Sequence, residues 1–362
     1  MKFKALDSIT FKIFCLFLAS FILMFGYNTV EAAYPLKCYK EAIIVLSILY
    51  LSLTLFYPLV SYLISFIPVG RLIILSPIGY SLFSVAPLLD FYIAIILAIT
   101  LGFLAAIFWI GCKAIIFHEV NENSWGVAFG LLSFVSIIAS GLGPFIFLGY
   151  PSKYLKLYIH THFDVFLISS VICSLATIPL LYLRNIKVQD RPRFKIKLTR
   201  IFIIYLVISF CYSSSYSILI SYIPLLAPTL IGEYRFLSYA IPSTLSTLGG
   251  LLYDRFGPIV FPPLSLITLI SFANLEKDFI IWGFFFNLSI SLLFPGFQAH
   301  LGKIIKSSEI IAALGIAGFV SGFSLPLNSL LIGILPLEFT RLYLTALFFT
   351  GFILSFTFVI AR

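Results

Sequence analysis

Polar side chains inside long apolar runs are the residues of this sequence with the clearest potential for chemistry. Burying such groups in a bilayer is expensive, so they are candidates for contact with a solute or an ion. The candidates are Tyr27, Asn28, Glu31, Ser213, Tyr216, Asn287, Gln298 and Asn328. Their hydroxyl, amide and carboxyl groups could bind a small molecule. Each could equally be satisfied within its own helix or by a neighbouring one.

Glu31 is the acid nearest to the interior of the first apolar run, about one turn before Pro35. A carboxyl group at this depth could exchange a proton with its surroundings. The alternative is an ionised, inactive side chain at the headgroup level, because residues near the end of a span can reach the interface. No other acid lies well inside an apolar run, which favours a neutral or weakly charged solute.

Other chemistry finds little support in the sequence. His160, His162 and Asp164 form an H-x-H-x-D run that could ligate a metal, but no further ligand is evident, and we expect neither a metal site nor a cofactor. The four histidines belong to no H-E-x-x-H motif, and there is no nucleophile elbow. We therefore expect no catalytic residues, and an intramembrane enzyme is the least favoured alternative.

The composition indicates which kind of secondary structure carries these candidate residues. Of the 362 residues, 61% are hydrophobic and only 10% are charged, with a mean hydropathy of +1.12. A soluble domain could not cover its surface with so few charges, and a bilayer span needs about 20 apolar residues. The sequence predicts an all-α polytopic membrane protein with twelve transmembrane helices. Their expected ranges are 10–33, 43–65, 71–89, 91–112, 125–149, 162–183, 201–225, 236–253, 258–274, 279–301, 310–334 and 340–361.

The distribution of basic residues predicts the orientation. Sixteen of the 23 Lys and Arg residues fall on the side of the N-terminus when the twelve spans are threaded through a bilayer. Basic loops stay in the cytoplasm, so both termini are expected there, in a protein of the cell membrane. The net charge of +9 thus reports topology, and we expect the lipid bilayer, not nucleic acid, as a partner.

The chain divides into two similar halves. We expect a six-helix bundle over 1–183, a basic cytoplasmic linker over 184–200 and a second six-helix bundle over 201–362. Tyr27 precedes a Pro-Leu pair by eight residues, and Tyr216 precedes another by the same distance, at an offset of 189. Gly70 and Gly257 repeat at an offset of 187. Such offsets indicate two pseudo-repeats of six helices.

A short charged stretch, GGLLYDRFGP, separates the eighth and ninth predicted spans. Gly250 lets a helix approach its neighbour closely, and Gly257 allows a sharp turn. Asp254 can cap the N-terminus of an adjacent helix, and Arg255 places a positive charge at the membrane edge.

The spacing of Gly250, Asp254, Arg255 and Gly257 resembles the cytoplasmic loop motif of the major facilitator superfamily. The basic pair that follows it in the family is replaced by Pro258 and Ile259. The resemblance implies two bundles that rock about a central site, with this loop acting as a conformational gate that steadies the outward-open state. It also implies that spans one, four, seven and ten line the cavity, which supports the candidates of the first, seventh and tenth spans.

A second resemblance lies in the fifth predicted span. Gly130, Gly143 and Pro144 match part of a glycine-rich motif that is most common in the antiporters of this superfamily. An ordinary interface of small residues explains them equally well. In the fourth span, Ala98 stands where proton-coupled members often carry arginine.

The sequence thus predicts a monomeric secondary active or facilitative transporter of a small solute, with coupling to protons or another ion as one option. The main alternative is a transport-inactive receptor or assembly protein with the same fold, because the first-half loop around Gly70 lacks the acid.

Overall fold

The structure is a computed structural model that describes residues 2–148, 162–188, 198–218, 222–226 and 234–360. Within these ranges every regular element is helical and no strand is present. In a bilayer, a helix satisfies the backbone hydrogen bonds that water cannot reach.

Eleven helical stretches of the described chain are long and apolar enough to cross a membrane. One of them, Ser246–Lys277, contains the end of the eighth predicted span and the whole of the ninth, and α15 (Ser246–Phe256) ends at a turn before α16 (Phe261–Asn274). The predicted fold class, an all-α protein of twelve membrane-spanning helices, is therefore confirmed.

The chain forms two compact units. Unit 1 comprises Met1–Asn121 and Val135–Phe194, and unit 2 comprises Glu122–Phe134 and Lys195–Arg362. The helix α6 (Trp125–Leu148) begins in unit 2 and ends in unit 1. The predicted bundle boundaries stay a prediction, and residues 189–197 of the predicted linker lie outside the described residues.

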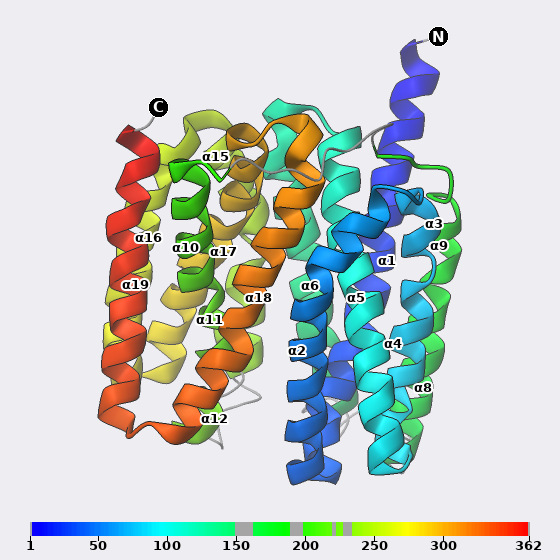
Figure 1. The fold of residues 1–362 in the computed structure, drawn as a ribbon. Coiled ribbons are helices and arrows are strands. Elements are labelled where there is room, and N and C mark those ends of the chain that lie inside the picture. Colours follow the sequence, from blue (N-terminus) through cyan, green and yellow to red (C-terminus); the bar gives the residue numbers. More distant parts are fainter. Residues whose placement is uncertain (1, 149–161, 189–197, 219–221, 227–233, 361–362) are drawn as a thin grey trace. The chain divides into compact units, whose positions relative to one another are not determined.

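Unit 1 is built around α1 and α5, as the blue and cyan ribbons of Figure 1 show. In it, α2 packs along α5, α8 packs along α1, and α4 contacts both α5 and α8. Its helices are α1 (Lys2–Lys37), α2 (Tyr39–Ile64), α3 (Val69–Ile73), α4 (Ser76–Ser84), η1 (Ala86–Leu88), α5 (Phe91–Glu119), α8 (His162–Leu175) and α9 (Thr177–Leu181).

Small residues allow the close packing of unit 1. A Cβ atom on Gly102 of α5 would lie 2.6 Å from the Cβ of Ser52 and 2.8 Å from the backbone nitrogen of Leu53, both on α2. Van der Waals contact of this kind is a main source of helix association in membranes.

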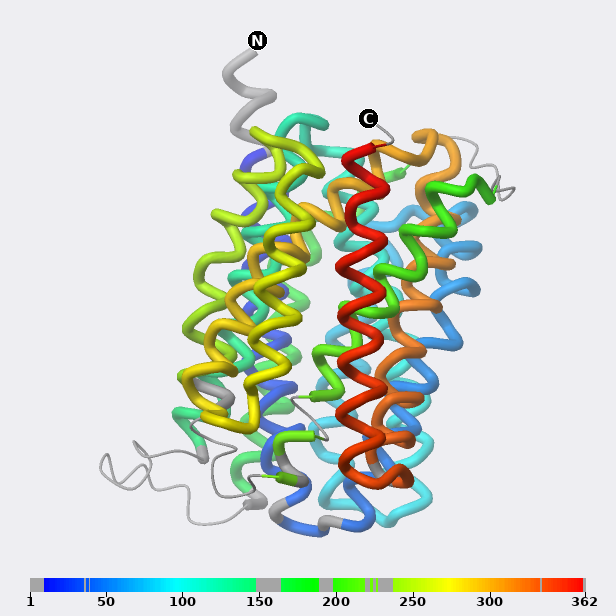
Figure 2. The backbone as a smooth tube through the Cα atoms, turned by 90° about the vertical axis from the view of Figure 1, so that its left-hand side faces the viewer, coloured from blue at the N-terminus to red at the C-terminus, as the bar shows by residue number. Residues whose placement is uncertain are grey.

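Unit 2 is built around α17, with α15 and α16 packed against it. The helix α10 packs against α18 and α19, and Figure 2 shows α19, in red, beside α10. The further elements are η2 (Glu122–Ser124), α10 (Arg200–Ser213), α11 (Ser215–Ser217), α12 (Ile223–Leu226), the π-helical turn η5 (Tyr234–Ala240), α14 (Ile241–Ser243), η6 (Gly257–Val260), η7 (Leu275–Lys277), α17 (Phe279–Ile304), η8 (Ser307–Glu309), α18 (Ile310–Ile334) and α19 (Leu337–Ile360).

Several predicted spans differ from the helices observed, among them the fourth and the seventh. The fourth was expected to end at 112, but α5 continues to Glu119, because apolar residues follow Lys113. The seventh was expected as one helix over 201–225, but α10 ends at Ser213 and α11 starts at Ser215. The hydroxyl of Ser214 donates to the carbonyl of Phe210 (2.9 Å), and such side-chain bonds compete with regular helix geometry.

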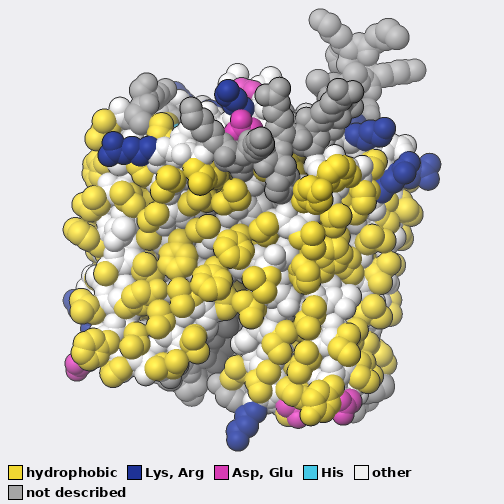
Figure 3. Space-filling model, in the orientation of Figure 1, with side chains coloured by type: hydrophobic (Ala, Val, Ile, Leu, Met, Phe, Trp, Pro, Cys, Tyr) yellow, Lys and Arg dark blue, Asp and Glu magenta, His cyan; other side chains and the backbone are white. Residues whose placement is uncertain are grey.

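Large apolar side chains cover the outer surface of both units, including Leu55 and Ile96 of unit 1 and Ile267 and Ile353 of unit 2. Figure 3 shows this apolar surface, with charged side chains mainly near its upper and lower margins. A surface of this kind suits the hydrocarbon core of a bilayer.

Candidate functional site

The loop motif forms a helix cap. The carboxylate of Asp254, near the end of α15, accepts a hydrogen bond from the backbone N–H of Gly126 at Oδ1 (3.0 Å) and one from that of Val127 at Oδ2 (2.9 Å). Both amides belong to the first turn of α6, where backbone donors have no partner within the helix. A negative charge there also interacts favourably with the helix dipole. This is the cap that the sequence predicts for Asp254.

Glycines bring the two helices into backbone contact. A Cβ atom on Gly250 would lie 1.9 Å from the carbonyl oxygen of Gly126. One on Gly130 would lie 2.7 Å from the carbonyl oxygen of Ser246. Any side chain at these positions would separate α15 from the start of α6 and move Asp254 away from the amides. Gly126, which the sequence analysis missed, carries no motif signal beyond its place at the start of a predicted span.

The other two motif residues have different surroundings. Gly257 ends α15 with φ 68° and ψ −152°, a conformation that glycine adopts without steric cost. Arg255 is exposed, and its guanidinium carbon lies 5.3 Å from the ring centroid of Phe256. Among the described residues Arg255 forms no ion pair, so the contacts of the motif come from Asp254 and the glycines.

The other part of the predicted span-five motif packs within unit 1. A Cβ atom on Gly143 would lie 2.3 Å from the carbonyl oxygen of Phe25 on α1. Pro144 lies within α6 and is half-buried. Gly130 and Gly143 thus allow close packing of the same helix against α15 and against α1.

The candidates of the first span form a buried polar cluster in unit 1. Glu31 is 4% exposed and accepts a hydrogen bond from the hydroxyl of Tyr50 on α2. The hydroxyl of Tyr27 donates to that of Tyr50 (3.3 Å). Asn28 donates to the carbonyl of Met24 in its own helix (3.0 Å). We call Tyr27, Glu31 and Tyr50 the Glu31 cluster.

The carboxyl group of the Glu31 cluster forms no ion pair in the part of the chain that the structure describes. A charge without a partner inside a bilayer is costly. Tyr50 could not be predicted as a member of the cluster, because a tyrosine in an apolar run carries no signal of its partner.

The candidates of unit 2 lie partly together. Asn328 of α18 is fully buried, donates from Nδ2 to Ser214 Oγ (2.7 Å) and accepts at Oδ1 from the hydroxyl of Tyr343 (2.6 Å). This network joins α18 and α19 to the interruption between α10 and α11. Ser213 and Tyr216 flank that interruption and are half-buried.

Two further candidates belong to α17. Asn287 is buried and donates to the carbonyl of Gly283, one turn earlier in its own helix (2.9 Å). Gln298 is half-buried.

Replacing Asn328 with alanine is expected to lower the stability of unit 2. Side-chain hydrogen bonds between membrane helices contribute about 0.6 kcal/mol each on average, so losing two should cost about 1–2 kcal/mol. The change in melting temperature of the purified protein measures this. The control is Asn274→Ala, which removes one bond within a single helix, to the carbonyl of Ile270. Equal shifts in the two variants would show that the network adds nothing to stability.

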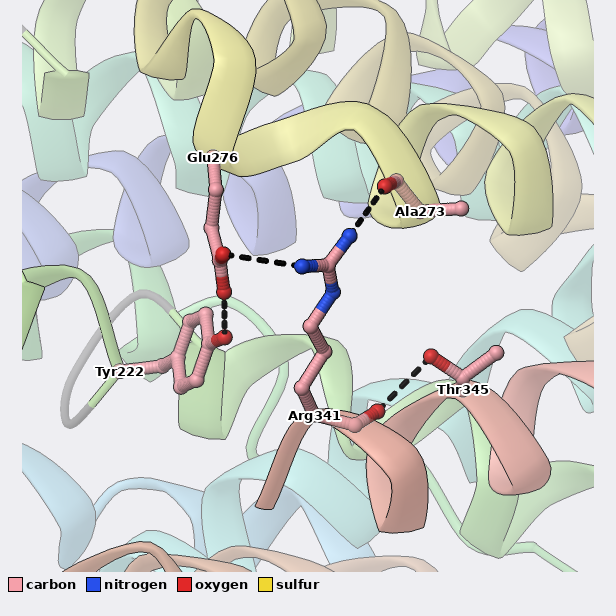
Figure 4. Close-up of polar contacts among 5 residues, drawn as sticks. All are labelled: Tyr222, Ala273, Glu276, Arg341 and Thr345. Atoms are coloured by element: carbon pink, nitrogen blue, oxygen red, sulfur yellow. Dashed lines mark hydrogen bonds and ion pairs between the residues drawn. The ribbon is translucent and has the colours of Figure 1, made fainter. Parts of the chain in front are cut away.

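A third polar cluster, missed by the sequence analysis, joins the ends of helices in unit 2 (Figure 4). Glu276 of η7 accepts from the hydroxyl of Tyr222 (2.5 Å) and pairs with Arg341 of α19 (3.1 Å). Arg341 also donates to the carbonyl of Ala273 (3.1 Å). The side chains of Arg341 and Glu276 are 47% and 30% exposed, so this ion pair contributes at most about 1 kcal/mol. Its partners are all supplied by the protein, which makes it a structural contact.

No group of three or more His, Cys, Asp or Glu residues within the described ranges is arranged to hold a metal ion. His160 of the H-x-H-x-D run lies outside the described residues.

The helices and their apolar surface define a polytopic integral membrane protein. The model of one family, the Major Facilitator Superfamily, matches residues 16–273, which is more than half of the chain. The chain therefore belongs to the Major Facilitator Superfamily. A sequence comparison with curated proteins finds no match.

Solved transporter structures share the fold over almost the whole chain. A bacterial homologue of the iron transporter ferroportin, in an outward-facing state, has a TM-score of 0.71 at 16% identity and covers 97% of this chain and 100% of its own. The human organic anion transporter MFSD10 has a TM-score of 0.73 at 9% identity, covering 96% and 99%. The fucose:proton symporter FucP of E. coli has a TM-score of 0.71 at 12% identity, covering 96% and 98%. At such identities the likeness establishes the fold.

Proposed function

We propose that this protein is a secondary transporter that moves a small solute across the membrane by alternating access. The proposal rests on the Glu31 cluster, in which a 4% exposed carboxyl group of the first span accepts a hydrogen bond from Tyr50 and forms no ion pair among the described residues. A merely structural acid in a bilayer is normally paired with a cation. In a chain of this family, the cluster is suited to bind a proton or a polar group of the solute.

Proton coupling is the mode of transport that this cluster supports best. Glu31 can take up a proton while Tyr50 keeps its hydrogen bond to the carboxyl group. A neutral Glu31 is tolerated in the bilayer far better than an ionised one, so its protonation can bias the equilibrium between two conformations. FucP, one of the solved relatives by fold, is a proton symporter. The expected solute remains neutral or weakly charged, and Tyr27, Asn28, Ser213, Tyr216, Asn287, Gln298 and Asn328 are its proposed contacts.

The Asp254 cap is the proposed conformational gate. It fixes the start of α6 to the end of α15 through two charge-assisted hydrogen bonds and the backbone contact at Gly250. A contact that is made in one state and strained in the other sets the balance between the two states. We assign the cap to the outward-open state, in a monomer of the cell membrane with both termini in the cytoplasm.

A transport-inactive receptor is the second candidate, and the first-half loop favours it. A Cβ atom on Gly70 would lie 1.8 Å from the carbonyl oxygen of Leu183, and the Gly70 N–H donates to Ile186 (3.1 Å). This turn is tightly packed, but no acid stands near Gly70 and Arg71 in the sequence to repeat the cap of Asp254.

A ligand screen followed by a flux assay tests the proposal. Purified protein is melted with sugars, amino acids, peptides, nucleosides, organic anions and lipophilic cations in turn. A ligand at 100 times its dissociation constant stabilises the folded state by about 2.7 kcal/mol. We expect one chemical class to raise the melting temperature, and Tyr216→Ala or Asn28→Ala to remove the shift.

The same ligand must then show counterflow in sealed vesicles. Binding without counterflow would contradict the transporter proposal and support a receptor. The control for the two binding variants is Ser174→Ala, which removes an exposed hydroxyl of α8 and should leave both readouts unchanged.

A further inference from the structure

We infer that His300 is a positioning residue for the Asp254 cap, acting through Tyr253. His300 lies on α17, and Tyr253 directly precedes Asp254 on α15. The inference rests on the geometry of the cap. Only its consequence for transport rests on the proposed function.

Tyr253 is held on several sides. It is fully buried, and its ring stacks on that of Phe261 with centroids 5.5 Å apart and an interplanar angle of 14°. A Cβ atom on Gly296 would lie 2.6 Å from the Cβ of Tyr253, so α17 contacts the tyrosine directly. The ammonium group of Lys303 lies 4.9 Å from the ring centroid, within the range of a cation–π contact.

A hydrogen bond between Tyr253 and His300 completes this environment. The tyrosine hydroxyl and Nδ1 of His300 lie 2.8 Å apart. The imidazole is 8% exposed and packs against Phe358 and Phe261, with centroids 4.6 and 5.7 Å away. Its Nε2 atom has no partner among the described residues. The bond to Tyr253 is therefore the one polar contact of a buried ring, and breaking it would leave both ring nitrogens unsatisfied.

Two other contacts between this part of the chain and α17 are made by residues that precede Tyr253. The hydroxyl groups of Ser243 and Ser291 lie 3.0 Å apart near the start of α15, and a Cβ atom on Gly249 would lie 2.2 Å from the carbonyl oxygen of Leu292. These contacts hold the first half of α15, and the residues just before it, against α17. In the last turn, Tyr253 contacts α17 at Gly296 and through its hydrogen bond to His300. Because consecutive helical residues are about 100° apart, holding Tyr253 on this side leaves Asp254 on a different side, where it meets the amides of α6.

Hydrogen exchange at the start of α6 tests this role independently of transport. The peptide over 122–134 contains the two amides that Asp254 accepts from. We expect Tyr253→Phe and His300→Leu to speed its exchange by about three- to tenfold, the range for one lost hydrogen bond. His300→Asn retains a hydrogen-bonding group near the position of Nδ1 and should restore slow exchange. A peptide from α5 in unit 1 should not change.

A double variant separates positioning from general stabilisation. If His300 acts through the cap, His300→Leu should add nothing to the exchange of 122–134 when Asp254→Asn is already present. A full additional increase there would overturn the inference. So would unchanged exchange in both single variants, or an equal increase in the α5 peptide. Faster exchange at 122–134 with normal counterflow would support the positioning role and contradict the proposed gate.

Discussion

Gly250→Ala is expected to slow solute counterflow by at least about tenfold, even where the protein still folds. The new Cβ atom would lie 1.9 Å from the carbonyl oxygen and 2.3 Å from the carbonyl carbon of Gly126. Backbone atoms cannot rotate away as a side chain can, so α15 and α6 must separate. A shift of about 1 Å would stretch the hydrogen bonds of Asp254, now 2.9 and 3.0 Å, beyond the useful range. One tenfold step in rate corresponds to about 1.4 kcal/mol.

A loss of counterflow in Gly250→Ala would be informative, because alanine is normally a better helix former than glycine. In a helix interior, replacing glycine with alanine gains about 1 kcal/mol, whereas overpacking costs about 1–3 kcal/mol. Gly111→Ala is the matched control. Its Cβ atom would lie 3.3 Å from the side-chain ends of Ile73 and Val69, which can yield. We expect near-normal counterflow and melting temperature for this variant. Normal counterflow in Gly250→Ala would show that the close approach is dispensable.

Asp254→Asn distinguishes the steric effect from the electrostatic one. Asparagine keeps the size of the side chain but loses its charge, and its amide nitrogen cannot accept from the second backbone N–H of α6. We expect slower counterflow with a folded protein, because hydrogen bonds to charged groups contribute about 1.5–3 kcal/mol. Counterflow as fast as in the unmodified protein would contradict the gating role of the cap.

The helical architecture could be predicted because every membrane span must be apolar over the thickness of the bilayer. Apolar length sets the position of a helix, and α6 begins at Trp125, where the fifth span was expected. A glycine between two spans predicts a sharp turn, and Gly257 forms one with a positive φ. The interruption at Ser214 was missed, since it depends on the bond from Ser214 to Phe210 and on Asn328, far along the chain.

The partners of the candidate residues could not be predicted, for a different reason. A span that is apolar on all faces gives little information about its rotation, so the sequence does not reveal which side faces a neighbour. Glu31 was singled out as the acid nearest to the interior of the first span, but Tyr50 was not recognised as its partner. Asp254 was expected to cap a helix, but the amides that it meets lie more than 120 residues earlier. His300 and Tyr253 are 47 residues apart, and Tyr253 occupies a variable position of the loop motif.

Glu31→Gln is expected to abolish accumulation driven by a proton gradient while leaving counterflow in place. Glutamine still offers a carbonyl oxygen to the hydroxyl of Tyr50, so the packing between α1 and α2 should persist. It cannot exchange a proton, so binding of proton and solute would no longer be linked. Coupling between two ligands typically changes affinity by about 5- to 150-fold, and we expect gradient-driven uptake to fall by at least about fivefold.

The measurement compares two assays on the same proteoliposomes: uptake driven by an imposed pH difference, and counterflow at equal pH. Glu338→Gln is the control, because Glu338 is an exposed acid in the first turn of α19 and should affect neither assay. Tyr50→Phe removes the hydroxyl but keeps an ionisable Glu31, so coupling should survive. Gradient-driven accumulation in Glu31→Gln equal to that of the unmodified protein would exclude Glu31 as the coupling site. Loss of counterflow as well would instead place Glu31 in contact with the solute, since an acid needed only for coupling is not required for exchange at equal pH.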